Sequence, residues 1–358
     1  MGFDEVLKNA EENEITKEEA LYLFKETGRY DKALKLFEIA SRVRDDEIGN
    51  VFKLDGFIGL ITHCTVDPPC RYCWNSSTIN RSGFGIESVL AIDEIVEGAR
   101  LIEETGISMV ELGGGTTVGS SGEKVIKAVK AVKKATNLSI WINVGPALSE
   151  STLRELKKLG VAEVCSSFEV NPLNERLFKE VKPGDDLDAR KKLAEMINDV
   201  GLGYASVLMC GLGESYENRV DHMFYLKQFE NFKYFLITWF HPVPRTPMAN
   251  YPLTSPLEAA KTAAIGRLIF RDIDIHISGY EHIPLWIMAG VNRVVHAGAS
   301  VHRVRNGAGA RWHTIGAEVK HINDRLDFVN LLPTTVKFIT GAGMEVEPEI
   351  ERRWINEV

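Results

Sequence analysis

The sequence predicts an α/β protein built as a TIM-type (βα)8 barrel, with an N-terminal helical preface and a short C-terminal extension. Three observations support this prediction. The chain has 358 residues, 44% of them hydrophobic, which is enough to bury one large core. Strand-like and helix-like runs alternate along most of the chain. Glycine-rich and polar turns follow several strand-like runs, where barrel enzymes carry their chemistry.

The chain divides into three expected segments. Residues 1–48 form the helical preface, in which Thr16 is a plausible N-cap ahead of an apolar stripe. Residues 49–325 form the barrel. Residues 326–358 form an extension that packs on the lower end or the edge of the barrel.

Eight strands are expected, with helical runs between them. The eight strands are expected near 54–63, 108–112, 138–144, 163–168, 203–209, 235–240, 273–279 and 294–298. Helices between them are expected at Ile92–Glu104, Gly122–Ala135, Glu150–Leu159, Asp188–Val200, Glu217–Phe229 and Leu257–Phe270.

Composition excludes several classes of protein. The formal net charge of -8 argues against a general binder of nucleic acid or of anionic membranes. The N-terminus is acidic and polar, and no apolar run approaches the length of a membrane span, so we expect a cytoplasmic protein. Three of the five cysteines cluster and two stand alone, a usage that suits a reducing compartment and not a disulfide framework.

The loop after the first strand carries the strongest chemical signal. Cys64, Cys70 and Cys73 follow a C-x5-C-x2-C spacing, and Tyr72 adds an aromatic wall beside them. A zinc site requires a fourth ligand. Three thiolates instead suit a [4Fe-4S] cluster with one iron left open. Three ordinary buried thiols, or a zinc site completed from elsewhere in the chain, are the alternatives.

Later strand ends also carry candidate binding groups. Gly113 and Gly114 stand in a glycine-rich turn that lets a ligand approach the backbone closely, although a tight turn without a ligand is the alternative. Glu169 follows the fourth strand, where a carboxylate can accept hydrogen bonds from hydroxyls, or can be a solvated glutamate. Arg190 can clamp a carboxylate or lie on the surface.

These residues together resemble the radical S-adenosylmethionine (SAM) superfamily. Its usual signature is C-x3-C-x2-C with an aromatic residue before the last cysteine, so the first gap is two residues longer here. The resemblance extends over nearly the whole chain to the biotin synthase and HydE-like subgroup, which also contains methylornithine synthase. It includes the turn from Gly211 to Arg219 and the segment from His241 to Ala249.

The resemblance implies cofactors and site residues. It implies a [4Fe-4S] cluster on the three cysteines and SAM contacts at Tyr72, Gly113, Gly114, Glu169, Arg190 and Gly211. Within that set, Glu169 matches the carboxylate that meets the SAM ribose, and Arg190 matches the arginine near the SAM carboxylate. The family's "GGE" turn is altered here, because its third position is Gly115.

Other positions separate the chain from biotin synthase proper. Glu111, Trp141 and Ala205 stand where biotin synthase has cysteines for a second cluster, so sulfur insertion by that route is not expected. Cys165 and Cys210 are expected to fill core space. The C-x5-C-x2-C spacing resembles the HmdB (HcgA) family, which implies a role in biosynthesis of the iron-guanylylpyridinol (FeGP) cofactor of [Fe]-hydrogenase.

The implied activity is reductive cleavage of SAM to methionine and a 5′-deoxyadenosyl radical. Such an enzyme needs a small-molecule substrate and a reducing electron donor, and other cofactor-assembly proteins are candidate partners. No nucleic acid and no membrane is expected as a partner. Two alternatives remain: an enzyme resembling HydE or methylornithine synthase that acts on an amino-acid-type substrate, and a non-catalytic Fe-S carrier.

Alternation along the later strands predicts which residues face inward and could contact a substrate. A tryptophan or histidine in a barrel is more often an ordinary core residue, and a loop arginine is often solvated. The candidates are Trp141, Asn143, Trp239, His241, Arg245, Ser278, Tyr280 and His296.

Overall fold

A computed structural model describes residues 2–73, 89–295, 298–303, 316–324 and 326–355. Eight parallel strands form a closed barrel, because β1 pairs with β2 on one side and with β8 on the other. The strands are β1 (Val51–Ile58), β2 (Met109–Gly113), β3 (Ser139–Asn143), β4 (Glu163–Cys165), β5 (Gly203–Cys210), β6 (Phe232–Trp239), β7 (Asp274–Ile277) and β8 (Arg293–Val294). The predicted TIM-type fold is confirmed, and each expected strand position carries a strand.

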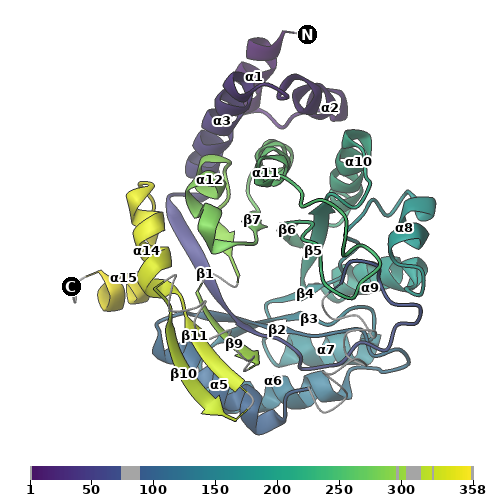
Figure 1. Cartoon of the computed structure of the whole chain (residues 1–358), viewed down its shortest axis with the longest axis vertical. Coiled ribbons are helices and arrows are strands. Elements are labelled where there is room, and N and C mark those ends of the chain that lie inside the picture. The colour runs from purple at the N-terminus through teal and green to yellow at the C-terminus, as the bar shows by residue number, and fades with distance from the viewer. Residues whose placement is uncertain (1, 74–88, 296–297, 304–315, 325, 356–358) are drawn as a thin grey trace.

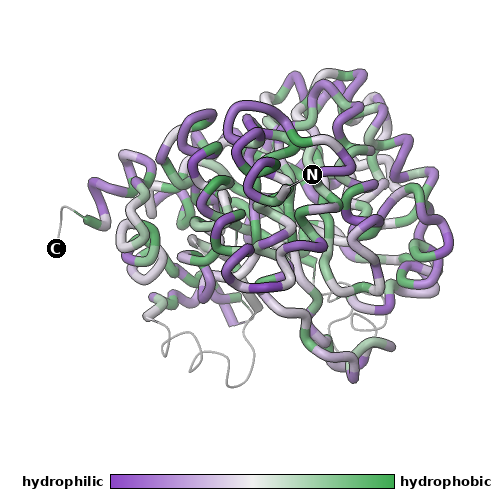
Figure 2. Tube along the Cα trace, turned by 90° about the horizontal axis from the view of Figure 1, so that it is seen from above, coloured by the Kyte–Doolittle hydropathy of each residue, from purple (hydrophilic) through white to green (hydrophobic). Residues whose placement is uncertain are grey.

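Helices cover the outside of the barrel (Figure 1). They are α5 (Ile92–Glu104), α6 (Glu123–Ala135), α7 (Glu150–Lys158), α8 (Glu175–Val181), α9 (Leu187–Val200), α10 (Tyr216–Leu226), α11 (Pro256–Phe270) and α12 (Ile283–Met288), with the short 3-10 helix η3 (Tyr280–His282) before α12. Hydrophilic residues gather on the outer helices and loops, as Figure 2 shows from above. Among the described residues, no helix is both long and apolar enough to cross a membrane.

Side-chain caps fix where several of these helices begin. Ser149, Asn174, Asp186 and Ser215 each accept a hydrogen bond from a backbone N–H in the first turn of the helix that follows. The helix α9 ends at Gly201, whose φ of 72° closes the last turn in the left-handed conformation.

Three helices precede the barrel: α1 (Phe3–Glu12), α2 (Lys17–Glu26) and α3 (Tyr30–Ile48). The predicted N-cap Thr16 is confirmed, since its hydroxyl accepts the Glu19 N–H while its own N–H donates to the Glu19 carboxylate. The helix α3 packs on α11 and α12, and α2 packs on α10 and α11 (Figure 1). The preface therefore covers the second half of the barrel from outside.

The C-terminal region adds strands beside β1. Strand β9 (Ala299–Arg303) runs parallel to β1, and an antiparallel hairpin of β10 (Glu318–Asn323) and β11 (Leu326–Asn330) pairs with β9. Then α14 (Leu332–Gly341), β12 (Glu345–Val346) and α15 (Pro348–Trp354) follow, with β12 parallel to the start of β1. The hairpin begins before residue 326, so the expected boundary falls inside it, and the three-part division stays a prediction.

The lower half of the barrel is filled by a buried ionic group that we call the floor cluster: Arg293, Asp55, Glu163 and Asp274. The guanidinium of Arg293 lies 2.8 Å from Asp55, 2.9 Å from Glu163 and 3.2 Å from Asp274. It also stacks on the Tyr234 ring at 3.8 Å. This cluster closes the barrel at the N-terminal ends of its strands and leaves the opposite end for a site.

Candidate functional site

The cysteine loop, residues 59–73, leaves β1 and crosses the C-terminal end of the barrel. Its first part is held by β2 and the turn after it, because the Ile61 N–H donates to the Gly113 carbonyl at 3.0 Å and the Thr65 N–H donates to Thr116 at 2.9 Å. Its last part is held by the C-terminus of α8, where the Arg71 N–H donates to Val181 at 2.9 Å. The loop is therefore fixed on both sides of the cavity.

The glycine turn allows the cysteine loop to pack closely. A Cβ on Gly114 would lie 2.3 Å from the Thr62 hydroxyl, and a Cβ on Gly115 would lie 2.4 Å from the Cys64 nitrogen. The third glycine, where the family pattern has a carboxylate, thus makes room for Cys64. Both glycines line the cavity described next, whereas Gly113 does not, because it faces the side chains of Glu111 and Phe57.

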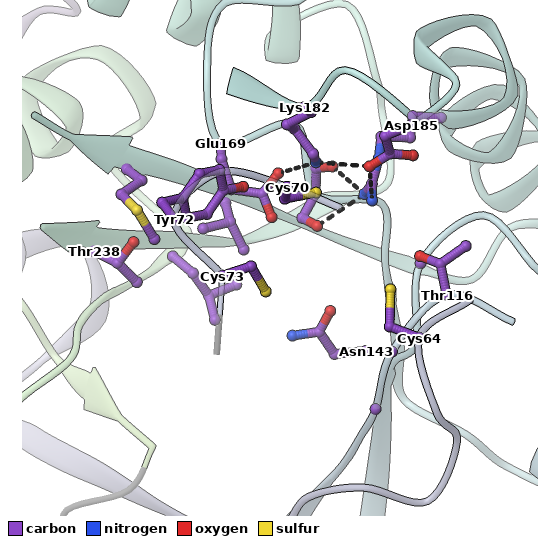
Figure 3. A pocket seen from close by; sticks show the side chains of 18 of the residues that line it. Cys64, Cys70, Tyr72, Cys73, Thr116, Asn143, Glu169, Lys182, Asp185 and Thr238 are labelled. Atoms are coloured by element: carbon purple, nitrogen blue, oxygen red, sulfur yellow. Dashed lines mark hydrogen bonds and ion pairs between the residues drawn. The ribbon is translucent and has the colours of Figure 1, made fainter. Parts of the chain in front are cut away.

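The three predicted cluster ligands line one cavity of about 220 Å³ (Figure 3). Cys64, Cys70 and Cys73 are all free thiols, and Tyr72 lies in the same wall with 6% of its surface exposed. Burial raises the pKa of Cys64 and raises the pKa of Cys70 to about 11.

The arrangement of donors fits a cluster. Among the described residues, no three His, Cys, Asp or Glu side chains converge closely enough for a single metal ion. A [4Fe-4S] cluster does not need such convergence, because each thiolate binds a different iron. Three thiols that line one cavity match the three protein ligands of a cluster that keeps one iron open.

A second group on the cavity wall, the wall network, consists of Glu169, Lys182, Asp185 and Arg190. The Lys182 ammonium lies 2.5 Å from the Glu169 carboxylate and 3.1 Å from that of Asp185. Arg190 lies 2.6 Å from Asp185. Figure 3 shows Glu169, Lys182 and Asp185 beside Cys70.

The electrostatics of the wall network favour its charged form. Burial alone would raise the pKa of Glu169 and of Asp185, but the positive charges of Lys182 and Arg190 outweigh it and lower both pKa values. Burial would likewise lower the pKa of Lys182, yet the carboxylates of Glu169 and Asp185 raise it. The two anions and two cations therefore balance.

Most N–H groups of Arg190 donate hydrogen bonds within the protein. Its Nη1 donates to the carbonyl and the hydroxyl of Ser167, and its Nε and Nη2 donate to Asp185. Four of its five N–H groups are thus engaged with described residues, which leaves one for a ligand in the cavity.

The deep end of the cavity is polar on two walls. On β2 and β3, the Asn143 amide donates to the Glu111 carboxyl at 3.0 Å. Burial raises the pKa of Glu111 to about 8. On β6, the buried Thr238 hydroxyl has no hydrogen-bond partner among the described atoms. His276 and Ser278 on the β7 side complete this lining.

Several predicted residues lie outside the cavity lining. Trp141 is fully buried below it and donates to Asp55 at 2.9 Å. Gly211 lies in a turn whose amide donates to the Glu214 carboxylate at 2.9 Å. Arg245 is exposed, and Tyr280 is half-buried in η3. His296 lies outside the described residues.

The expected alternation on the sixth strand has the wrong phase. Thr238 lines the cavity, whereas Trp239 packs against Trp286 of α12, with the ring centroids 5.1 Å apart, and His241 is exposed. The inner face of β6 carries the even-numbered residues, because Leu236 lines the same cavity as Thr238 and Tyr234 contacts Arg293 of the floor cluster.

The sequence analysis did not predict Lys182, Asp185 or Thr238 as site residues. It mentioned Glu111 only as a residue that stands where biotin synthase has a cysteine. The run Lys182-Pro183-Gly184-Asp185 is a turn signal after a short helix. It could have drawn attention to this turn, although nothing local reveals that its charges face Glu169.

Comparisons with known proteins agree with this geometry. A family model described as the radical SAM superfamily matches residues 58–226. An uncharacterized protein of Methanocaldococcus jannaschii is 41% identical over 273 residues, 76% of this chain and 70% of that protein. A biotin synthase of Trichlorobacter lovleyi is 28% identical over 291 residues, 78% of this chain and 84% of that enzyme.

Among solved structures, the fold is similar to that of methylornithine synthase. The TM-score is 0.72 at 22% sequence identity, over 82% of this chain and 85% of that one. At this identity the likeness concerns the barrel and its arrangement of strands.

Proposed function

The chain belongs to the radical SAM superfamily, and we propose that Cys64, Cys70 and Cys73 hold a [4Fe-4S] cluster with which this enzyme cleaves SAM. One observation carries the proposal. The three free thiols, Tyr72, Glu169 and Arg190 come from distant parts of the sequence and line a single cavity. A cluster bound by three cysteines has an open iron, which the SAM amino and carboxylate groups can chelate.

When bound, the cluster and SAM supply one-electron cleavage to methionine and a 5′-deoxyadenosyl radical, which abstracts hydrogen from a substrate. The protein orients these groups. Glu169 accepts hydrogen bonds from ribose hydroxyls, and the remaining N–H of Arg190 donates to the SAM carboxylate. Backbone groups at Gly114 and Gly115 border the methionine end. The floor cluster and the enclosing barrel keep water from the deep end.

The substrate is proposed to bind at the deep end, between Glu111 and Asn143 on one wall and Thr238 on the other. Of the predicted substrate contacts, Asn143 and Ser278 line this region. The proposal does not extend to Trp141, Trp239 or His241, which are buried elsewhere or exposed.

We further propose that the reaction belongs to biosynthesis of the FeGP cofactor of [Fe]-hydrogenase. The resemblance of the C-x5-C-x2-C spacing to the HmdB (HcgA) family supports this assignment. The enzyme then acts in the cytoplasm with a reducing electron donor, and with other cofactor-assembly proteins as candidate partners.

A second candidate substrate class is an amino acid. The resemblance of the sequence to the subgroup that contains methylornithine synthase supports this candidate. Deuterated candidates of both classes, supplied with SAM and reductant, separate the two, because only a true substrate transfers deuterium into 5′-deoxyadenosine. The third alternative, a non-catalytic Fe-S carrier, is set aside because the family is one of enzymes.

The decisive experiment reconstitutes the protein anaerobically with iron and sulfide, reduces it with dithionite, adds SAM and measures 5′-deoxyadenosine and methionine. We expect both products from the wild-type protein and neither from Cys70→Ala. Product formation by Cys70→Ala would contradict the assignment of the cluster. A loaded cluster without any affinity for SAM would contradict the assignment of the reaction.

A further inference from the structure

Lys182 is a lysine with almost no contact with solvent. It is 1% exposed, and its ammonium lies 5.1 Å from the centre of the Phe178 ring. Burying an ammonium group is unfavourable unless nearby anions compensate for it. Its two compensating carboxylates both belong to the wall of the SAM cavity, which indicates a role there and not only in the core.

Lys182 determines which oxygen of Glu169 is available. Oε2 of Glu169 is bound to the ammonium at 2.5 Å, whereas Oε1 makes no hydrogen bond with the described residues. The backbone of Glu169 is fixed as well, with a φ of 61° and two hydrogen bonds to β5, at 2.9 Å to Val207 and 2.8 Å from Met209. One oxygen is held, and the other is left for a ligand in the cavity.

Lys182 also reaches Arg190 through Asp185. Oδ2 of Asp185 receives the ammonium at 3.1 Å and the guanidinium at 2.6 Å. The same lysine therefore contacts the residue proposed to meet the ribose and the anion that holds the residue proposed to meet the SAM carboxylate. Without Lys182, the wall network would carry one excess negative charge next to the cluster.

The position of Lys182 is tied to the cysteine loop. A Cβ on Gly184, two residues later, would lie 2.2 Å from the Pro68 carbonyl oxygen, so the turn and the loop are in direct backbone contact. The preceding residue, Val181, accepts the Arg71 N–H. Lys182 is thus placed relative to Cys70 and to Glu169 by the same turn.

We propose that Lys182 is a positioning residue for SAM, which holds Glu169 in the orientation that receives the ribose and keeps the wall network electrically balanced. This inference rests on the proposed function, since it concerns the same cavity and the same ligand.

The test uses holoproteins reconstituted anaerobically and compares Lys182→Met, Lys182→Arg, Glu169→Gln and the double variant Lys182→Met/Glu169→Gln. Lys179→Met is the matched control, because Lys179 is an exposed lysine on α8, three residues before Lys182. Iron and sulfide per chain are measured first, and the dissociation constant for SAM is measured by equilibrium dialysis.

We expect Lys182→Met to weaken SAM binding by about tenfold or more, the loss of one charge-assisted hydrogen bond, with unchanged iron content. Lys179→Met should bind SAM as the wild type does, and Lys182→Arg should recover part of the affinity. In the Glu169→Gln background the lysine substitution should have little further effect, because its main partner has lost its charge.

A dissociation constant within about twofold of wild type for Lys182→Met would overturn the proposal, as would fully additive effects in the double variant. Loss of iron from folded Lys182→Met would also overturn it, in favour of a role in holding the cluster. If Lys182→Met does not fold, the SAM affinity of the double variant, which removes both charges, is compared with that of Glu169→Gln. A large further loss of SAM affinity in the double variant would refute the proposal. Failure of the wild-type holoprotein to bind SAM would instead refute the proposed function.

Discussion

The barrel contains two buried ionic groups, and they differ in what surrounds them. The floor cluster joins one guanidinium to three carboxylates and contacts Trp141 and the Tyr234 ring, without bordering the cavity. The wall network joins two cations to two anions and borders a cavity. The comparison teaches that burial of charge by itself does not mark a site. An ionic group becomes a candidate site when one of its oxygens or N–H groups is left facing a cavity.

If the floor cluster is structural, breaking it should lower stability and spare SAM binding. Arg293→Met leaves three carboxylates without their guanidinium, so the free energy of unfolding should fall by about 3–5 kcal/mol. Urea denaturation measures this fall, and equilibrium dialysis of the folded holoprotein should give a wild-type dissociation constant for SAM. A variant as stable as the wild type would remove the distinction between the two groups.

Asp55 of the floor cluster and Asp185 of the wall network should contribute to the pH dependence of stability with opposite signs. Burial, together with Glu163 and Asp274, raises the pKa of Asp55 from 3.8 to about 6 despite Arg293. Between these values the folded protein binds more protons than the unfolded chain, so stability falls as pH rises, by at most about 3 kcal/mol. The lowered pKa of Asp185 has the opposite effect. The stability that it contributes is present above pH 3.8 and is lost as the pH falls below that value.

The Asp55→Asn variant isolates the contribution of Asp55 to the pH dependence of stability. The variant should lose the decline in stability between pH 4 and 6, whereas the wild type should show it in urea titrations at several pH values. An identical pH profile in both proteins would mean that Asp55 does not carry the proton.

In the wall network, a single substitution should alter ligand binding more than folding. Glu169→Gln preserves size but removes the charge that binds Lys182 and that is proposed to receive the ribose. We expect formation of 5′-deoxyadenosine at limiting SAM to fall by about 10- to 100-fold, at about 1.4 kcal/mol per tenfold change. Rates at limiting and saturating SAM, with the unfolding curve as control, would show whether the loss lies in binding.

The smallest effect is expected where the floor cluster reaches solvent. Lys53 pairs with Asp274 at 2.8 Å, but 49% of its side chain is exposed. Lys53→Met should therefore change the free energy of unfolding by no more than about 1 kcal/mol. A larger loss would show that the floor cluster depends on this exposed lysine, which would then have to be counted as part of it.

The sequence predicted the barrel well because alternation and helix caps are local. The N-cap at Thr16 and the helix Ile92–Glu104 follow from neighbouring residues alone. Cys64, Cys70, Cys73, Glu169 and Arg190, predicted from spacing and resemblance, all line one cavity.

What the sequence did not predict depends on contacts between distant segments. Whether Thr238 or Trp239 faces inward depends on how β6 pairs with β5, and alternation along the sequence alone does not decide it. Lys182 lies 13 residues after Glu169, and their ion pair exists only because the turn after α8 folds back over the strand end. The wall network could therefore be recognised only in three dimensions.

The anchoring of the cysteine loop has a consequence for how the protein is made. The Arg71 N–H donates to Val181, and the Arg71 carbonyl accepts the Met248 N–H at 3.2 Å. The cysteine loop is thus synthesised early, but the backbone contacts that hold it are complete only when residues up to 248 have left the ribosome and folded. A cluster assembled on the nascent loop would lack this support. We therefore expect the proposed cluster to be assembled on the finished chain, after translation.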